Sequence, residues 1–392
     1  MLFVILILTF MNETYFLAIE TSCDDTSMSV LRAEEDGRGR LKKIEALSNV
    51  VSSQTELHAG YGGVYPFLAK REHQKNLPAV FENAAKKFDL SKLKFIAVTQ
   101  GPGLDPCLWT GINFAQDLAK KYNLPLVGAN HLEAHFLANL LTLGIGEDEF
   151  AKNYLPAVCL VVSGGHTLLF LATGIGDYKL LGQTVDDAAG ECFDKAARIL
   201  GLGYPGGPEI AKYAAYHSVE VKPPLDLLLK RRFSGGLTST TSTTSEPLLV
   251  KLPRPMMRQK NYNFSFSGLK TAILYFHQKQ AEETKKSPEY LQAMSYEIQQ
   301  AIAEVLVFKT ARAAKEFAAK SIIIGGGVSA NLALRQAMQK TAGDLGVKFL
   351  APSGDLSMDN AAMAGAAAYF AWKRGEIVAD PDDLQSQPNL GI

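Results

Sequence analysis

The chain has 392 residues, more than one compact core usually holds, so we expect two domains. Nearly half of its residues, 47%, are hydrophobic, which is enough for substantial burial. Its formal net charge is zero, which excludes attraction of nucleic acid by the overall field, so an RNA partner would need a local basic patch or a helper protein.

An apolar run, MLFVILILTFM, occupies residues 1–11. It lacks the basic region in front and the small-residue cleavage site behind that a signal peptide requires. It is also too short to cross a bilayer. The residues after it, NETYFLAIETS, are typical of the start of a core strand. We therefore expect residues 1–10 to be an extension ahead of the fold, and no attachment to a membrane.

Two segments, 15–33 and 157–172, share the pattern of an apolar strand, a small polar turn and a second apolar strand. Helical patterns follow each segment, near 66–88 and 107–122 and near 187–200 and 287–319. This alternation predicts two α/β domains, 11–150 and 151–392, each a sheet covered by helices. The joint is expected within 144–156, where glycine, acidic residues and proline interrupt the pattern.

Residues 217–263 break this rhythm with a low-complexity run, TSTTSTTS, and several prolines. We predict an inserted flexible lid within the second domain, and a C-terminal helix that packs back on the first domain. The basic side chains of the insert are Lys230, Arg231, Arg232, Lys251, Arg254, Arg258 and Lys260. A solvated loop is favoured over a patch that contacts phosphates.

The segment GANHLEAHFL, residues 128–137, places His131 and His135 four residues apart. On a helix this spacing puts both imidazoles on one face, where they could bind one metal ion or make ordinary helix contacts. The acid between them, Glu133, lies two residues after His131 and points to roughly the opposite side. It therefore does not match the metalloprotease signature H-E-x-x-H. A third ligand would decide between the two interpretations.

Two more turns are rich in small residues. In VVSGGHT, residues 161–167, the glycines let an anion approach the backbone, although an ordinary hairpin would have the same composition. The run GGGVSAN, residues 325–331, follows an apolar strand and opens a helix, where nucleotides meet amide-rich helix starts, and Asn331 could contact ribose or base. Together the turns predict a nucleotide cleft between duplicated halves. This arrangement resembles the actin, sugar kinase and heat-shock chaperone superfamily, built on duplicated ribonuclease H-like folds.

The four cysteines are scattered without C-x-x-C spacing, at Cys23, Cys107, Cys159 and Cys192. This spacing argues against a disulfide framework and against a cysteine zinc site. It favours a reducing compartment, so we predict a cytoplasmic protein.

Nine motifs follow one another along the chain. They are ETSCDDTS (20–27), HAGYGGVYPFLAKREHQKNL (58–77), QGPGL (100–104), NHLEAH (130–135), VSGGHT (162–167), DDAAGECFDKAARILGLGYPGGP (186–208), FSFSGLKT (264–271), GGGVSAN (325–331) and MDNAAM (358–363). The same motifs in the same order characterise TsaD, the catalytic subunit of bacterial tRNA threonylcarbamoyladenosine synthesis. The chain resembles this family from about residue 15 to 373, apart from the insert.

The resemblance implies a set of site residues. The metal of the family is held by two histidines and the aspartate of a D-N-A-M-type motif, here His131, His135 and Asp359, and iron is favoured over zinc as the one divalent ion. The acyl-adenylate is expected to contact Val161, Val162, Ser163, Gly164, Gly165, Asp194, Gly207 and Asn331. The C-D-D turn implies a catalytic role for Asp24 and Asp25, which could position a nucleophile or take up a proton.

The implied activity is transfer of the threonylcarbamoyl group from threonylcarbamoyl-adenylate to the N⁶ amine of the adenosine just 3′ of a tRNA anticodon, with help from the metal. The implied partners are tRNA, a non-catalytic TsaB-like paralogue and a TsaE-like ATPase. Two alternatives are a metalloprotease, which would need a base beside the histidines, and an ATP-regulated actin-like binding scaffold, which would need no metal.

Two positions depart from the family pattern. After GPGL the family usually continues with small residues and a glycine, whereas this chain has Asp105, Pro106 and Cys107. The family pattern therefore does not predict the conformation of this loop. Many relatives carry an aspartate three residues after GGP, where this chain has Ala211. One expected interaction with the ligand is therefore absent.

Overall fold

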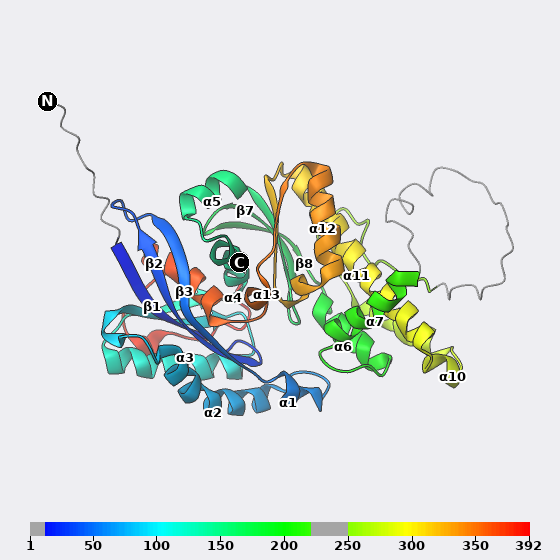
Figure 1. The fold of residues 1–392 in the computed structure, drawn as a ribbon, viewed down its shortest axis with the longest axis horizontal. Coiled ribbons are helices and arrows are strands. Elements are labelled where there is room, and N and C mark those ends of the chain that lie inside the picture. The colour runs from blue at the N-terminus through cyan, green and yellow to red at the C-terminus, as the bar shows by residue number, and fades with distance from the viewer. Residues whose placement is uncertain (1–11, 221–249) are drawn as a thin grey trace.

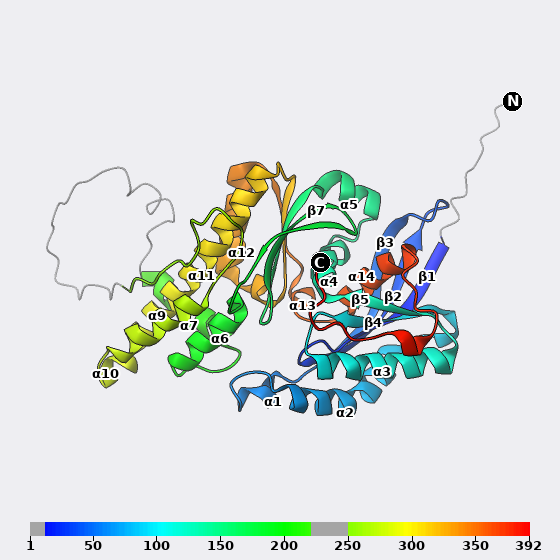
Figure 2. The same ribbon diagram turned by 180° about the vertical axis from the view of Figure 1, so that it is seen from behind.

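The computed structural model describes residues 12–220 and 250–392 (Figure 1). The N-terminal extension expected at residues 1–10 and most of the expected insert lie outside these ranges. Two five-stranded sheets stand side by side, with helices packed on their faces (Figures 1 and 2). The architecture is therefore mixed α/β, as the sequence predicts.

The first sheet has the strand order β3-β2-β1-β4-β5. Its strands are β1 (Asn12–Glu20), β2 (Asp25–Glu35), β3 (Leu41–Ser53), β4 (Leu93–Gly101) and β5 (Leu126–Asn130). Strands β1 to β3 form an antiparallel meander. Strands β4 and β5 continue the sheet from the other edge of β1, parallel to it.

The second sheet has the order β10-β9-β6-β7-β8. Its strands are β6 (Ala157–Val162), β7 (Thr167–Gly174), β8 (Asp177–Gln183), β9 (Ser321–Gly325) and β10 (Lys348–Leu350). Again three strands form an antiparallel meander, and two more extend the first of them in parallel. One topology thus occurs twice, which confirms the predicted duplicated ribonuclease H-like fold.

Helices connect and cover the strands of both sheets. In the first half they are α1 (Thr55–Ala59), α2 (Pro66–Ala85), η1 (Leu90–Lys92), α3 (Asp105–Tyr122), α4 (His131–Leu143) and α5 (Glu147–Tyr154). In the second half they are α6 (Ala189–Ile199), α7 (Gly206–Glu220), α9 (Ser267–Gln278), α10 (Glu282–Lys285), α11 (Pro288–Glu316), η2 (Gly327–Ala330), α12 (Leu332–Leu345), α13 (Gly354–Ser357), α14 (Ala361–Lys373) and η3 (Pro381–Asp383). Within the described ranges no helix combines the length and the apolarity needed to span a membrane.

Three buried cores lie between these layers. Along β1 the side chains alternate, so that Leu17 and Ile19 face α2 and α3 while Phe16 and Ala18 face the centre of the molecule. The central core encloses α4 and α14 between the two sheets. The third core lies on the outer face of the second sheet, beneath α6, α7, α9, α11 and α12. The helix with the two histidines is therefore buried between the halves.

Helix α14 comes late in the sequence but packs against the first sheet. A Cβ atom at Gly365 would lie 2.5 Å from Cδ1 of Leu31 in β2 and 3.1 Å from Cβ of Ala18 in β1. Only glycine allows the helix to approach the strands this closely. The first sheet and the C-terminal part of the chain consequently share one core.

The residues after α14 continue across the first half. The side-chain amide of Asn130, at the end of β5, donates to the carbonyl of Gly391 at 2.6 Å. The backbone N–H of Gln387 donates to the carbonyl of Gln100 in β4 at 2.7 Å. The C-terminal segment is thus attached to the ends of two strands.

The unusual residues after GPGL form the start of α3, because Asp105 is its first residue and Pro106 lies in its first turn. A proline there costs no helix hydrogen bond. Ser386 Oγ, from the C-terminal segment, donates to the carboxylate of Asp105 at 2.5 Å. Cys107, two residues later, is completely buried.

The described end of the insert, residues 250–263, is packed against α11. The guanidinium of Arg254 pairs with Glu297, and its Nε donates to Glu304 at 2.9 Å. Leu252 and Tyr262 are buried in the third core. The guanidinium of Arg254 is therefore occupied by ion pairs with α11.

Candidate functional site

The two histidines are held by the start of α4. Asn130 caps this helix, because its Oδ1 accepts hydrogen bonds from the backbone N–H groups of Leu132 at 2.8 Å and Glu133 at 3.3 Å. His131 is the first helical residue, and His135 follows one turn later. Both imidazoles are buried, and their ring centroids lie 4.6 Å apart. The predicted shared face of the helix is confirmed.

Asp359 approaches the same two rings from the start of α14. Its Oδ1 lies 3.3 Å from Nε2 of His135 and 3.6 Å from Nε2 of His131. One ligand atom from each of the three residues fits within 4.8 Å. Two nitrogens and a carboxylate oxygen thus converge on a volume of the size that one metal ion takes.

His135 provides an independent sign that the cluster fits a cation. Both of its ring nitrogens are buried. Among the described residues Nδ1 has no hydrogen-bond partner, and Nε2 has the carboxylate of Asp359 at 3.3 Å. Buried polar atoms that lack partners are costly and uncommon in folded proteins. A metal ion held by Nε2 and this carboxylate would give both a partner, so the donor set fits a divalent ion.

Glu20 supports His131 from the other side of the ring. It is completely buried at the end of β1, and its Oε2 lies 3.2 Å from Nδ1 of His131. The hydroxyl of Thr99 in β4 donates to the same oxygen at 2.6 Å, and the N–H of Ser22 donates to Oε1 at 2.5 Å. This arrangement fixes the imidazole and directs its Nε2 toward Asp359.

The charges of the cluster depend on one another. Burial disfavours the charged form of His131, but the carboxylates of Asp359 and Glu20 outweigh it and raise the pKa of His131 to about 9. Burial favours neutral Asp359, yet His131 and His135 hold its pKa well below the usual range. Burial lowers the pKa of His135. The carboxylates thus attract positive charge, which a metal ion would provide.

Glu133 points away from the cluster, as its place in the sequence predicts. The phenol of Tyr178 donates to its carboxylate at 2.7 Å, and Arg374 lies 3.6 Å from the same oxygen. Glu133 is therefore held between β8 and the end of α14. The general base that a metalloprotease would need is not available from this residue.

Asp24 and Asp25 lie at the turn between β1 and β2. Burial is the main cause that raises the pKa of both carboxyls, to about 7 for Asp25. Oδ1 of Asp25 is buried without a hydrogen-bond partner among the described residues. A carboxyl with a pKa near neutrality can accept a proton at the pH of the cell.

The turn that carries these aspartates is braced by His73 of α2. Its Nε2 lies 3.0 Å from the carbonyl of Cys23, and its Nδ1 lies 2.8 Å from the hydroxyl of Thr26. His58, in α1, is also buried and is close enough to Asp24 for their charges to interact. Two histidines from the second motif therefore support the first.

The predicted anion-binding turn lies between β6 and β7. Val161 and Val162 are completely buried at the end of β6, so contact of either with a ligand stays a prediction. The N–H of Ser163 donates to the carbonyl of His166 at 2.8 Å, which closes the turn. At Gly164 and Gly165 a Cβ would meet no described atom within 4 Å. The two glycines are open to an approaching group, but contact with the adenylate stays a prediction.

Asp194 and Gly207 lie on two consecutive helices, α6 and α7. Oδ1 of Asp194, in α6, accepts a hydrogen bond from the N–H of Gly206 at 2.7 Å. Burial raises the pKa of Asp194 to about 6, against the effect of that hydrogen bond. Asp194 therefore holds the start of α7, where Gly207 lies. A ligand contact for either residue stays a prediction.

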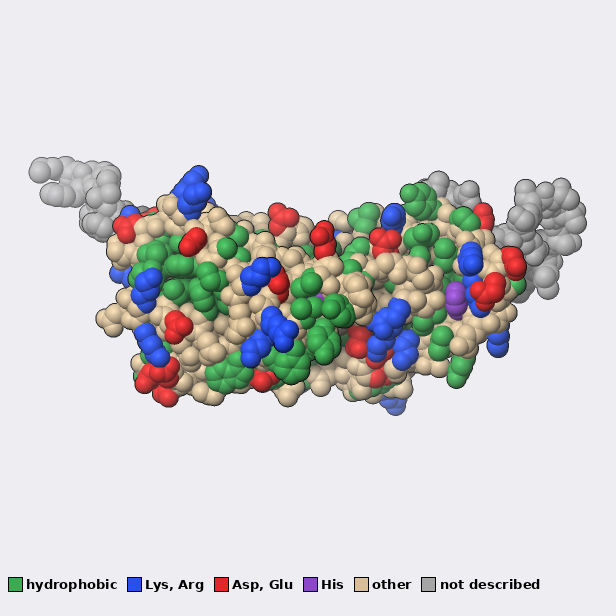
Figure 3. Space-filling view, turned by 90° about the horizontal axis from the view of Figure 1, so that it is seen from below, with side chains coloured by type: hydrophobic (Ala, Val, Ile, Leu, Met, Phe, Trp, Pro, Cys, Tyr) green, Lys and Arg blue, Asp and Glu red, His purple; other side chains and the backbone are tan. Residues whose placement is uncertain are grey.

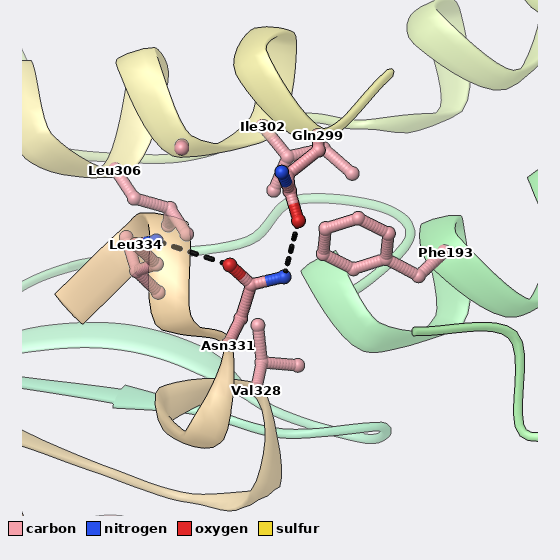
Figure 4. Close-up of a pocket in the computed structure, with 8 residues that line it drawn as sticks. Phe193, Gln299, Ile302, Leu306, Val328, Asn331 and Leu334 are labelled. Atoms are coloured by element: carbon pink, nitrogen blue, oxygen red, sulfur yellow. Dashed lines mark hydrogen bonds between the residues drawn. The ribbon is translucent and has the colours of Figure 1, made fainter. Parts of the chain in front are cut away.

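Asn331 has a structural role that the sequence did not reveal. Its Oδ1 accepts the N–H of Leu334 at 3.0 Å and so caps α12, while its Nδ2 donates to Oε1 of Gln299 at 2.8 Å (Figure 4). Phe193 and Ile302 line the pocket around it. The side chain is thus engaged on both ends, and its contact with ribose or base stays a prediction.

Sequence reasoning missed Glu20 and gave His166 no role. An acid at the last position of an otherwise apolar strand was the signal for Glu20, because such a buried charge requires a partner. The ring of His166 lies 6.1 Å from that of His131, between centroids. Burial and the two other histidines lower its pKa to about 4. His166 is consequently neutral at physiological pH.

Comparison with known proteins gives a consistent result. The profile of one family, described as TsaD, tRNA N6-adenosine threonylcarbamoyltransferase, matches residues 45–366. Three curated proteins are named tRNA N6-adenosine threonylcarbamoyltransferase. The Thermosipho africanus protein is 40% identical over 96% of this chain and 99% of its own length, and that of Thermomicrobium roseum is 44% identical over 93% and 94%. The Bacillus subtilis protein is 38% identical over 97% and 96%.

Proposed function

The chain belongs to the tRNA N6-adenosine threonylcarbamoyltransferase family, and from this premise we propose that His131, His135 and Asp359 hold a divalent metal ion that assists the transfer. The enzyme is an acyltransferase that modifies the N⁶ amine of an adenosine in tRNA. The observation that carries the metal proposal is the convergence of three ligand atoms within 4.8 Å. The buried Nε2 of His135, 3.3 Å from the carboxylate of Asp359, supports it.

We propose iron as the ion. Two imidazoles and one carboxylate are the ligand set of many non-haem iron sites, and three protein ligands leave open positions for substrate. An ion held there would polarise the carbonyl oxygen of the threonylcarbamoyl group as a Lewis acid. Iron and zinc share these ligands, so metal analysis decides between them.

The donor in this proposal is threonylcarbamoyl-adenylate, and the acceptor is the adenosine just 3′ of the anticodon. The amine nitrogen forms a bond to the carbamoyl carbon, the bond from that carbon to the phosphate oxygen breaks, and AMP leaves with the electron pair. The open turn at Gly164 and Gly165 offers backbone N–H groups to the phosphate. Asp25, whose pKa is about 7, takes up the amine proton.

The proposal includes two domains, 11–150 and 151–392, with the lid insert at about 217–263. The first sheet is built from residues 12–130 and the second from 157–350, which supports the division. We also propose that a TsaB-like paralogue and a TsaE-like ATPase assist the enzyme, on the basis of family membership. A cytoplasmic location stays a prediction.

The alternatives have less support. The metalloprotease needs a base beside the histidines, and Glu133 is engaged by Tyr178 and Arg374. The ATP-regulated scaffold needs no metal, so it does not explain why two buried histidines and the carboxylate of Asp359 lie together.

Metal analysis of single variants tests the proposal. His131→Ala, His135→Ala and Asp359→Ala should each lose the bound ion and the transfer activity, while His277→Ala, on α9, should retain both. Elemental analysis of purified protein identifies the ion. Full metal occupancy in the three variants would refute the site, whatever their activity.

A further inference from the structure

Three large aromatic side chains stand exposed at the junction of α1 and α2. Tyr61 is 64% exposed, Tyr65 54% and Phe67 64%. The rings of Tyr61 and Tyr65 are stacked, with centroids 6.0 Å apart and planes inclined by 22°. We refer to these three side chains as the aromatic platform. So much aromatic surface within one short segment is unusual in a folded protein and points to a binding role.

The platform is held rigidly. The N–H of Tyr61 donates to the carbonyl of His58 at 3.0 Å, and the N–H of Tyr65 lies 3.3 Å from Nδ1 of the same histidine. Arg198, from α6, donates to the carbonyl of Gly62 between the two tyrosines. Because the backbone is fixed from both halves of the molecule, little ordering entropy is lost when a ligand binds.

The platform is also connected to the turn that carries Asp24. Nε2 of His58, which fixes its backbone, lies 3.2 Å from Oε1 of Gln54, and the N–H of Gln54 donates to the carbonyl of Asp24 at 3.1 Å. Helix α6, which anchors Gly62 through Arg198, carries Asp194 as well. In the view from below, apolar side chains gather at the middle of the molecule, between basic groups on either side (Figure 3).

The charges next to the platform favour an anion. Lys70 and Arg71 follow it in the first turns of α2. Among the described residues, none forms a hydrogen bond or an ion pair with either side chain. Lys75, one turn further, pairs with Glu72 at 2.7 Å. Two cations are therefore available beside three exposed rings.

We propose that the aromatic platform binds the single-stranded loop of the tRNA, with bases stacked on Tyr61, Tyr65 or Phe67 and phosphates on Lys70 and Arg71. Unpaired bases are recognised in this way because they expose their faces to aromatic rings, while a duplex hides them. The platform would orient the loop so that its adenosine enters between the halves. This inference rests on the tRNA substrate of the family, and the metal proposal can fail without affecting it.

The test measures the affinity of the full chain for an unmodified tRNA transcript with an adenosine 3′ of its anticodon. A Tyr61→Ala, Tyr65→Ala, Phe67→Ala variant should raise the Kd about tenfold or more, because stacking is lost. Changing both tyrosines to phenylalanine should keep the affinity, since the rings remain. A Tyr216→Ala, Tyr275→Ala variant is the matched control, because these tyrosines are equally exposed on α7 and α9.

Salt dependence separates the two contributions. In a plot of log Kd against log salt concentration, a Lys70→Ala, Arg71→Ala variant should have a slope smaller by about 0.7 for each phosphate that is no longer neutralised. The aromatic variant should keep the slope of the parent. The melting temperature and bound metal of every variant should equal those of the parent. The single Tyr61→Ala variant provides a second, smaller change should the triple variant fold poorly.

Several results would overturn the proposal. They are an unchanged Kd in the aromatic variants, equal losses in the phenylalanine variant, and a parent chain that does not bind the transcript. An aromatic variant that loses association with another protein but keeps its tRNA affinity would assign the surface to a protein interface instead.

Discussion

Glu20 and His131 form a buried pair in which Oε2 of the carboxylate lies 3.2 Å from Nδ1 of the ring, leaving Nε2 directed at Asp359. The pair joins the last residue of a central strand to the first residue of a helix. Metal-binding histidines commonly have a carboxylate on the nitrogen that does not bind the ion, because it fixes the tautomer and makes the ligand more basic. Glu20 is therefore a positioning residue for the proposed site.

Replacing Glu20 with glutamine should weaken metal binding about 10- to 100-fold, because the amide keeps the shape of the side chain and loses its charge. Competition with a chromophoric chelator measures this change. Glu35→Gln is the matched control, since Glu35 is another buried acid, bonded to Tyr369 at 2.8 Å in the central core. Equal metal affinity in Glu20→Gln and the parent would show that the pair serves only the fold.

Removing the metal should lower the melting temperature of the parent. The ion would join the start of α4 to the start of α14, and a ligand that binds only the folded state adds about 2.7 kcal/mol when its concentration is 100 times its Kd. A chelator should therefore reduce the melting temperature of the parent but leave that of His135→Ala unchanged. Calorimetry with and without chelator measures both. The same shift in both proteins would mean that the stabilising ion is bound elsewhere.

Gly325→Ala should disturb the metal site from a distance. A Cβ at Gly325, in β9, would lie 2.6 Å from the carbonyl oxygen of His135 and 3.2 Å from its Cβ. Helix α4 must then shift, at a cost of about 1–3 kcal/mol, and metal affinity should fall. Gly343→Ala, in α12, is the control, because no described atom lies within 4 Å of its Cβ. Chemical denaturation and metal competition would show the effect, and normal metal binding in Gly325→Ala would contradict it.

Asn331→Ala should destabilise the protein by about 0.5–2 kcal/mol, because α12 loses its N-cap. Asn331→Ser keeps an oxygen that can cap the helix and should recover much of this loss. Urea denaturation measures both variants. If Asn331 also binds the adenylate, Asn331→Ser should raise the KM for the adenylate even though its stability is nearly normal. A fully stable Asn331→Ala protein would contradict the capping role.

Arg254→Ala should reduce stability and leave tRNA affinity unchanged. The guanidinium pairs with Glu297 and Glu304, and hydrogen bonds to charged groups contribute about 1.5–3 kcal/mol. The exposed Arg258 is the control, because Arg258→Ala should not change the denaturation midpoint. If Arg254→Ala lowers the affinity for tRNA without a loss of stability, this arginine contacts tRNA instead. Arg231 and Arg232 of the same insert lie outside the described residues.

The sequence was most informative where local patterns determine structure. Helices expected near 66–88 and 287–319 are present as Pro66–Ala85 and Pro288–Glu316; both begin at a proline, and Ser287 caps the second. The pairing of His131 and His135 followed from helical periodicity alone. Asp359 required the family resemblance, since no local pattern shows that the start of α14 meets the start of α4.

Other features depend on contacts between segments that are distant in the sequence. Glu20 ends a strand, but only the parallel pairing of β1, β4 and β5 brings Thr99 and His131 to it. Asn331 looked like a ligand because it follows a glycine-rich turn, and its bond to Gln299 in α11 became visible only in the folded chain. The aromatic platform could not be distinguished from core aromatics before its exposure was known.

The packing of α14 on the first sheet has a consequence for biosynthesis. The strands of the first sheet leave the ribosome long before Gly365, yet Ala18 and Leu31 are covered only when that helix arrives. The apolar face of the nascent first half therefore stays exposed while the second half is translated. At such a stage chaperones protect nascent chains from aggregation. Asp359 is translated just ahead of that helix, so the nascent chain cannot bring all three proposed ligands together until its last stretch is made.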